Sequence, residues 1–294
     1  MKILTKINLI FILIFGAGLF LVSRMAYDFL MENARSQVLQ QAELMMASAR
    51  STRDYTSEEL KPLLAVDQAH AKEFLPQTVP AYAATTTFNR LRKNYPEYLY
   101  KEASINPTNP RNRASDWETD VVTYFRNNPE KKQFVGERQA PTGQTMFLAR
   151  PISVGESCLE CHSVPSRAPR ALLKAYGKDN GFGWKPNEVI AAQVVSVPMT
   201  LPVSIADKAF RKLVAYLVSI FVLTLGVIDA ALVFIVIRPV RRLAISADKI
   251  SRGEMDMPEL EVSGRDEIAE VTTSFNRMHR SLAKALGMLR ASAS

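Results

Sequence analysis

Two long apolar stretches dominate the pattern of hydrophobic and polar residues along the chain. The first covers residues 7–22, is apolar apart from Asn8, and extends with its flanks over residues 4–25. The second covers residues 213–237, and Asp229 is its one charged residue. A helix needs about 20 residues, at about 1.5 Å each, to cross about 30 Å of hydrocarbon. The pattern therefore predicts two membrane-spanning helices, one near each end.

The first stretch also has the composition of a cleaved signal peptide, with Lys2 and Lys6 ahead of it. However, no small-x-small cleavage site follows the apolar run, which continues as Leu21-Val22-Ser23-Arg24-Met25. We therefore favour an uncleaved anchor. In the second stretch Asp229 is costly at bilayer depth, so we expect it to face another helix or to lie near the headgroups.

Basic residues at the ends of the two stretches indicate the topology. Lys2 and Lys6 precede the first, and Arg238, Arg241 and Arg242 follow the second. The positive-inside rule then predicts a two-pass protein of the bacterial inner (cell) membrane with both termini in the cytoplasm, although Lys208, Arg211 and Lys212 oppose it. The expected parts are an N-terminal anchor (1–25), an extracytoplasmic, periplasmic domain (26–212), a second transmembrane helix (213–237) and a cytoplasmic module (238–290).

Between the two stretches the pattern predicts helices first and strands afterwards. A mostly polar helix is expected over residues 26–53, and Thr56 with Glu59 fits a capping box that starts a new, short helix before Pro62. The remaining expected elements are a helix over 83–94, a strand over 98–105, a helix from the Ser115/Glu118 capping box to 127, and strands over 134–138, 145–152 and 189–197. This order favours an α+β, PAS-like sensor domain with its ligand between the sheet and the flanking helices.

The amino-acid composition indicates which classes of partner the chain can bind. The 294 residues carry a net charge of +8 and a pI of about 9.5. A basic balance fits an anionic membrane surface, and no zinc finger, Lys/Arg-rich run or aromatic RNA-binding box is present, so we expect membrane contact and no nucleic acid. Only two cysteines occur, three positions apart, which argues against a disulfide framework.

Those two cysteines form the motif Cys158-Leu159-Glu160-Cys161-His162, the attachment pattern of c-type haem. Two intervening residues let both sulfurs reach the two vinyl groups of one haem, and His162 then lies under the iron as the proximal ligand. A redox dithiol would need a thioredoxin-like context, which is absent. A zinc site would need a second ligand pair. The expected cofactor is one covalent haem c.

A sixth iron ligand could come from methionine or histidine. Met46 and Met45 lie on the expected helix after the first span, and His70 lies in a polar stretch. We order them Met46, His70, Met45, with an open or water-filled position as a further alternative. His279 lies beyond the second span and is expected to be a solvated helix residue.

Several strings resemble the Tll0287-like family, formerly a domain of unknown function, over residues 35–205. They are Arg53-x-Tyr55-Thr56-Ser57, Val79-Pro80-Ala81-Tyr82-Ala83, Asn106-Pro107-Thr108-Asn109-Pro110, Ala149-Arg150-Pro151, the haem motif and Gly181-x-Gly183-Trp184. The resemblance implies a PAS-like fold that holds one c-type haem and senses redox state or a gas. Some members use a cysteine of the N-terminal helix as second axial ligand, and this chain has none there.

After the second span, apolar residues follow a 3-4 alternation typical of coiled coils. A first helix with this seam begins at Pro239 and ends at Gly253, residues 255–264 form an extended connector, and a second helix opens at Asp266-Glu267. The expected seam positions are Val240, Leu243, Ala247 and Ile250, then Ile268, Val271, Phe275, Met278, Leu282, Ala285 and Leu289. This all-α two-helix arrangement resembles a HAMP domain, which implies a parallel four-helix bundle and so a homodimer.

The parts together predict a receptor that senses redox state or a diatomic gas through its haem and relays the state through HAMP. No kinase, cyclase or methyl-accepting region is present, so we expect no enzyme activity and a separate cytoplasmic output protein, such as a histidine kinase or chemoreceptor-type partner. The alternative is a membrane-anchored monohaem c-type cytochrome for electron transfer. A receptor for a non-haem small molecule is the third hypothesis.

Overall fold

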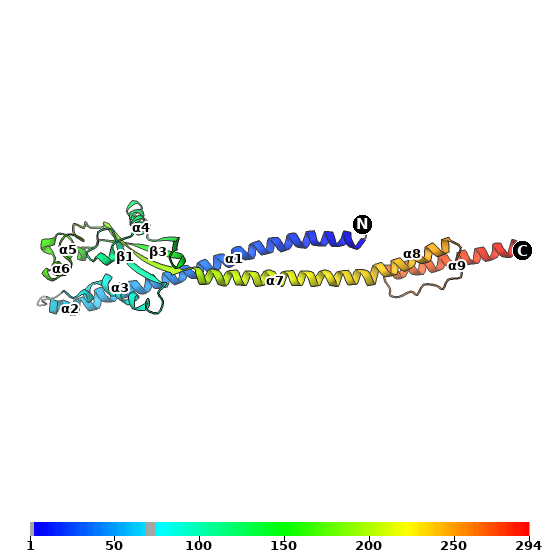
Figure 1. The fold of residues 1–294 in the computed structure, drawn as a ribbon, viewed down its shortest axis with the longest axis horizontal. Coiled ribbons are helices and arrows are strands. Elements are labelled where there is room, and N and C mark those ends of the chain that lie inside the picture. The colour runs from blue at the N-terminus through cyan, green and yellow to red at the C-terminus, as the bar shows by residue number, and fades with distance from the viewer. Residues whose placement is uncertain (1–2, 69–73, 294) are drawn as a thin grey trace. The chain divides into compact units, whose positions relative to one another are not determined.

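The structure is a computed structural model that describes residues 3–68 and 74–293. Figure 1 shows the order of its elements along the chain. The chain folds as two units, residues 26–210 and residues 1–25 with 211–294. Its α-helices are α1 (Ile3–Tyr55), α2 (Lys61–Gln68), α3 (Pro80–Leu91), α4 (Asp116–Asn127), α5 (Glu156–His162), α6 (Arg170–Tyr176), α7 (Thr200–Ala231), α8 (Arg238–Ser251) and α9 (Glu267–Ala293).

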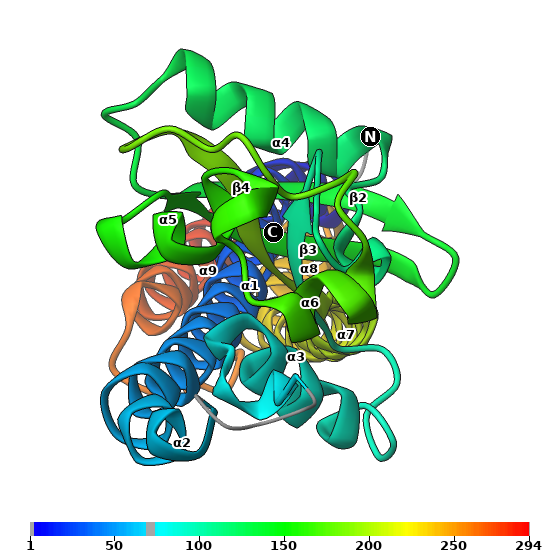
Figure 2. The same ribbon diagram turned by 90° about the vertical axis from the view of Figure 1, so that its left-hand side faces the viewer.

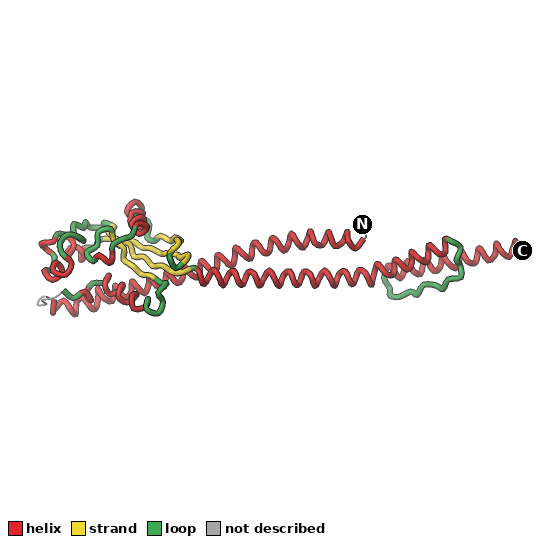
Figure 3. The backbone as a smooth tube through the Cα atoms, viewed as in Figure 1, coloured by secondary structure: helices red, strands yellow, loops and turns green. Residues whose placement is uncertain are grey.

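A four-stranded antiparallel sheet organises the unit of residues 26–210 (Figure 3). Its strands are β1 (Leu99–Ser104), β2 (Phe134–Ala140), β3 (Gly143–Ser153) and β4 (Val189–Pro198), in the spatial order β1-β4-β3-β2. The long central strands β3 and β4 pair from Thr145↔Pro198 to Ser153↔Val189, with an irregularity at Ile152/Ser153. The expected strands are confirmed, as is the α+β composition, and β2 and β3 form an antiparallel hairpin.

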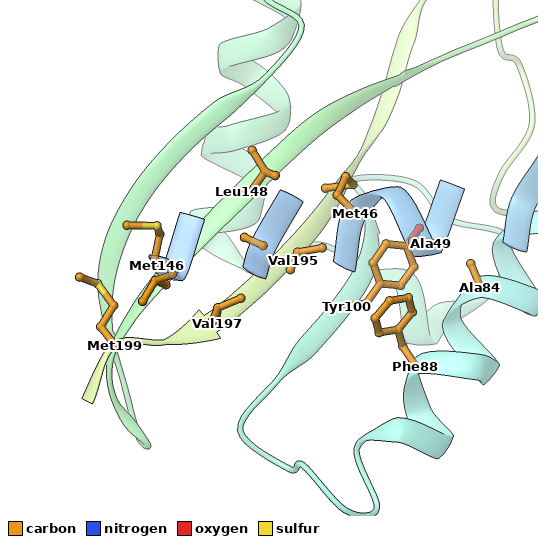
Figure 4. Close-up of a cluster of buried hydrophobic side chains, with 12 residues drawn as sticks. Met46, Ala49, Ala84, Phe88, Tyr100, Met146, Leu148, Val195, Val197 and Met199 are labelled. Atoms are coloured by element: carbon orange, nitrogen blue, oxygen red, sulfur yellow. The ribbon is translucent and has the colours of Figure 1, made fainter. Parts of the chain in front are cut away.

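Both faces of the sheet are covered, because alternate side chains of a strand point to opposite faces. Met146, Leu148, Val195 and Val197 face α1 and α3, where they pack with Tyr100 (Figure 4). The intervening residues of β3 and β4 face α4 on the other side (Figure 2). The helix α4 begins at the expected capping box, in which the Glu118 carboxylate accepts from both the backbone N–H and the hydroxyl of Ser115, each at 2.8 Å.

The capping box expected at Thr56 and Glu59 is wrong. Tyr55 is helical (φ −54°, ψ −43°), and residues 56–60 continue the helix as a π-helical turn into α2. The Thr56 hydroxyl donates to the Thr52 carbonyl, 2.7 Å away, instead of capping a new helix. Pro62 gives the physical reason: it lacks an N–H and crowds the carbonyl four residues back, so the hydrogen bonding widens and Lys61 N–H donates to Thr56 O.

The same physics recurs before Pro239 in the other unit. Residues Leu232–Ile237 are π-helical, and Arg238 N–H donates to Val233 O. Long helices containing residues 4–64 and 200–251 are apolar and long enough to cross a membrane, judged by length and composition. The Asn8 amide donates to Asp229 Oδ2 at 2.9 Å, which confirms that Asp229 faces another helix.

The helices α8 and α9 pack against each other and are joined by the connector of residues 252–266. The Asn276 amide exchanges two hydrogen bonds with the backbone of Leu260, at 3.0 and 2.8 Å. His279 lies 3.1 Å from the Met255 carbonyl and is only 6% exposed, so the expectation of a solvated His279 is wrong. The cause is the connector, which folds back over one face of α9. The expected seam lies elsewhere on α9 and is open, with Val271 54% and Met278 49% exposed.

Candidate functional site

The Cys-x-x-Cys-His motif lies on the short helix α5, just after β3. Gly155 precedes the helix in an extended conformation (φ −89°, ψ 168°). Cys158 and Cys161 are free and half-buried, and their spacing of three places both thiols on one face of the helix. Cys158 and the neighbouring Leu159 pack against an apolar cluster of Val154, Ile190 and Ala191 at the end of the sheet. The sheet thus fixes one end of the motif.

The imidazole of His162 is held on three sides. Its Nδ1 lies 2.7 Å from the Gly181 carbonyl and 3.3 Å from the Thr108 hydroxyl. The Trp184 indole stacks on the ring with centroids 4.0 Å apart and an angle of 15°. A carbonyl accepts only, so Nδ1 carries the proton and donates to Gly181. Nε2 then keeps its lone pair, as a metal-ligating histidine requires.

The segment that supplies this carbonyl is itself fixed by backbone contacts. Gly183 N–H donates to the Ser163 carbonyl at 2.9 Å, and Trp184 N–H donates to the His162 carbonyl at 3.3 Å. Gly181 N–H donates to the Asn106 side chain at 3.3 Å. Two loops distant in sequence therefore meet at His162, so the orientation of its ring depends on the tertiary structure.

The electrostatics of the motif favour neutral groups. Burial lowers the pKa of His162, and the hydrogen bond to Gly181 opposes this in part. Burial, then the neighbouring Glu160, raises the pKa of the Cys161 thiol. A dithiol that works as a nucleophile needs the opposite shift, since the thiolate is the reactive form. The motif therefore fits ligation by a neutral imidazole better than thiol–disulfide exchange.

The end of the long helical segment lies against the motif. Lys61 Nζ, at the start of α2, lies 3.7 Å from the Glu160 carboxylate between the two cysteines. In the last turn of α1, Arg53 pairs with Glu102 of β1 and lies within electrostatic reach of Cys158. The helix that contains the first apolar stretch therefore also borders the candidate site.

The candidates for a sixth ligand are in different places. Met46 is fully buried on the α1 face of the sheet, near Tyr100, Leu148 and Val195 (Figure 4). Met45 is partly buried and packs against the same cluster. His70 lies outside the described residues. Within residues 3–68 and 74–293, no group of three His, Cys, Asp or Glu side chains is placed to hold a metal ion.

A separate hollow lies between α4 and β2. It has a volume of about 410 Å³ and an aromatic lining that includes Trp117, Tyr124, Phe134 and Phe147. The Arg138 guanidinium lies over the Trp117 ring, 4.4 Å from its centroid. None of its lining residues belongs to the Cys-x-x-Cys-His motif. The hollow is therefore distinct from the candidate site.

A mixed α/β domain with an antiparallel sheet, two long apolar helices and a C-terminal helix pair fits a membrane receptor. The family model of the Tll0287-like domain (Tll0287) matches residues 31–198, which is more than half of the chain. The chain therefore belongs to the Tll0287-like family. A HAMP domain model matches residues 232–284, and the pair of domains indicates a signalling sensor.

Among solved structures, the chain is similar to one titled "Crystal structure of the cyanobacterial heme-protein Tll0287". The match has 16% sequence identity and a TM-score of 0.42, and covers 54% of this chain and 94% of that one. No curated protein matches the chain.

Sequence reasoning identified the motif but missed the residues that support it. Thr108, Gly181 and Trp184 were recognised only as parts of family strings, with no role assigned. The Arg53–Glu102 pair was also missed. The string Gly181-Phe182-Gly183-Trp184, with two glycines and a tryptophan, gave a signal of a loop with a defined conformation, but only the fold shows that this loop meets His162.

We predict that Gly181→Ala disrupts the site. Gly181 has φ +80°, and a Cβ there would lie 1.9 Å from the Thr108 hydroxyl and 2.8 Å from its backbone nitrogen. Gly183→Ala is the matched control, since Gly183 has φ +78° with nothing within 4 Å of its Cβ position. The positive φ alone costs about 1–3 kcal/mol in either variant. Thermal unfolding should show a clearly larger loss for Gly181→Ala, and equal losses would contradict the close contact.

Proposed function

We propose that this protein is a membrane receptor that senses redox state or a diatomic gas through one covalent haem c. The observation that carries the proposal is the His162 imidazole, whose Nδ1 is engaged by Gly181 so that Nε2 is available, directly beside two free, half-buried thiols. This donor set is the one that covalent haem requires. Cys158 and Cys161 would form the two thioethers and His162 would be the proximal iron ligand. When bound, the haem supplies a one-electron couple and an axial position for a small ligand.

The residues around the motif would orient and protect this ligand set. Gly181 fixes the tautomer and Trp184 fixes the plane of the imidazole. In a ligating histidine, a hydrogen bond from the ring N–H that does not face the metal also raises the basicity of the ligating nitrogen. The low pKa that burial imposes on His162 keeps a proton from competing for Nε2 near neutral pH.

For the sixth position we propose Met46, ahead of His70 and Met45. Met46 lies on the same helix as Arg53, seven residues earlier, which is about 10.5 Å along the axis. Seven residues are close to two helical turns, so both side chains project from the same side of α1. Met46 is fully buried among apolar groups, and a core methionine that binds no iron would be buried in the same way. The experiment below decides between these roles.

The topology that we propose places a PAS-like domain in the periplasm and both termini in the cytoplasm. The Asn8–Asp229 hydrogen bond supports an uncleaved first span, because it gives Asp229 a partner that removal of the first span would take away. The domain borders remain 1–25, 26–212, 213–237 and 238–290. The basic residues after the second span then lie at the cytoplasmic surface.

The signal would leave through the HAMP domain. A HAMP domain implies a relay to a partner protein. The exposed apolar seam of α9 indicates that a second copy of the chain completes the helical bundle. Val271, Met278, Leu282 and Leu289 are 41–64% exposed in the single chain. An apolar heptad seam of this kind is buried by a second copy in a parallel bundle. We therefore propose a homodimer whose two packings are biased by the haem state and read by a histidine kinase or chemoreceptor-type protein.

The first prediction from this proposed function concerns covalent haem. The full chain, made together with c-type haem maturation enzymes, should keep its haem through denaturing electrophoresis and stain for haem peroxidase activity. Cys158→Ser and Cys161→Ser should each weaken that stain and the double variant should abolish it, because the thioethers are lost. The Arg50→Gln variant, at an exposed position of α1, serves as a control for expression and export. A wild-type band without haem under competent maturation would overturn the proposed cofactor.

The second prediction concerns the sixth ligand. Met46→Leu nearly conserves volume and should cost less than about 1.5 kcal/mol, so the domain should still fold. If the sulfur binds iron, this variant changes the absorption and magnetic circular dichroism spectra, whereas Met45→Leu leaves them unchanged. A changed spectrum in His70→Leu alone would transfer the role to His70. Unchanged spectra in all three variants would indicate an open or water-filled position.

The third prediction separates a sensor from an electron carrier. Single cysteines at Val271 or Met278, on the open seam, should form disulfides between two copies severalfold faster than one at Thr272, which the connector covers at 7% exposure. In membranes, reduction of the haem should change the seam crosslinking rates. Rates independent of redox state, together with haem-dependent electron flow to a soluble carrier, would favour the alternative of a membrane-anchored cytochrome.

A further inference from the structure

A partly buried ion pair joins α1 to the sheet near the candidate haem site. Arg53 Nη1 donates to both carboxylate oxygens of Glu102, at 2.6 and 2.5 Å. The Tyr100 hydroxyl donates to the same carboxylate at 2.8 Å, and the Gln193 amide donates to that hydroxyl at 3.2 Å. Glu102 is only 4% exposed. Three elements, α1, β1 and β4, therefore meet in one chain of polar contacts.

This ion pair connects α1 to the sheet without capping a helix. On the opposite face of β1, Lys101 pairs with Glu118 at 2.6 Å, but Glu118 also caps α4, which explains its burial. Glu102 caps no helix. A buried ion pair can often be replaced by apolar residues without loss of stability, so stability is a weak explanation for it. Its position near the proposed haem site points to a role that needs charge.

Arg53 is positively charged and lies near the Cys-x-x-Cys-His motif. Burial by itself would lower the pKa of the guanidinium, but the Glu102 carboxylate outweighs burial and raises it. The side chain lies within electrostatic reach of Cys158, and Lys61, two turns further along, pairs with Glu160 of the motif. In partly buried surroundings such interactions are screened less than in water.

We propose that Arg53, held by Glu102, is the positioning residue through which the charge of the haem iron acts on α1. This inference rests on the proposed haem site. One electron from an external one-electron donor converts Fe(III) to Fe(II) and lowers the charge of the site by one; no bond to Arg53 forms or breaks. The repulsion between iron and guanidinium falls, while Glu102 remains. Arg53 lies in the last turn of the 53-residue helix α1, so a changed force on its side chain acts on that helix.

The charges of the pair predict opposite effects on the midpoint potential of the haem. Arg53→Gln removes a positive charge, which favours the oxidised form and shifts the potential downward. Glu102→Gln leaves Arg53 uncompensated, which favours the reduced form and shifts the potential upward. A purely structural role of the pair would loosen the same contact in both variants and would not produce opposite signs.

The test is spectroelectrochemical titration of the full haem-loaded chain in detergent. The matched control is Arg50→Gln, which removes an arginine from the same helix whose ion pair with Asp54 (3.7 Å) is exposed, with 71% and 55% of the side chains accessible. It should leave the potential near that of the wild type. Arg53→Lys and Glu102→Asp keep the charges and should also stay near the wild type.

Arg53 and Glu102 each have one variant that removes the charge and one variant that keeps it. If a variant of one residue fails to fold, the two variants of the other residue still test the proposal. Shifts of the same sign, shifts no larger than that of Arg50→Gln, or shifts as large in the charge-keeping variants would overturn the role of Arg53. Absence of covalent haem in the wild type would overturn the proposed function as well. Haem staining of the same samples distinguishes the two failures.

Discussion

The rest of the domain depends on the burial of both faces of β3 and β4. Along these strands successive side chains point to opposite sides, and each side is covered by a helix, α1 on one and α4 on the other. Burying both faces fixes the register, since a slip of one residue would exchange the two sets of apolar side chains. Cys158 packs against the cluster that contains Ile190 and Ala191 of β4, and the pairing of β1 with β4 places Glu102 opposite Gln193. The positions of the motif and of the ion pair thus follow from sheet packing.

The candidate site shows how a short helix becomes a rigid ligand set. The helix α5 has only seven residues and could not order itself in water. Its order comes from the sheet below Cys158 and from the loop that brings the Gly181 carbonyl and the Trp184 ring to His162. Burial lowers the pKa of the imidazole, and the hydrogen bond at Nδ1 leaves the lone pair on Nε2. Packing therefore orients the ring, the hydrogen bond fixes its tautomer, and burial lowers its pKa although that hydrogen bond opposes the shift.

Proline explains two departures from regular helix. Both π-helical turns end two residues before a proline, at Leu60 before Pro62 and at Ile237 before Pro239. In each case the helix accommodates the missing N–H by widening rather than by ending. One turn lies where the helix passes the motif, and the other lies just before the HAMP helices. Such turns are frequent at functional sites, because they alter helical register locally.

The sequence by itself determined whatever depends on local pattern and spacing. Its apolar runs, its period-two strands, the Ser115 cap and the Cys-x-x-Cys-His spacing were enough to predict two long helices, the sheet, α4 and the motif. The heptad seam indicated HAMP, which the family model confirmed. Tertiary structure decided the rest. The sequence at Thr56 is compatible with both a capping box and a π-helical turn that continues the helix, and the structure shows the π-helical turn. His279 is buried because the connector folds over it. The contacts of Arg53 with Glu102 and of His162 with Gly181 join residues 49 and 19 positions apart, and only chain folding brings such residues together.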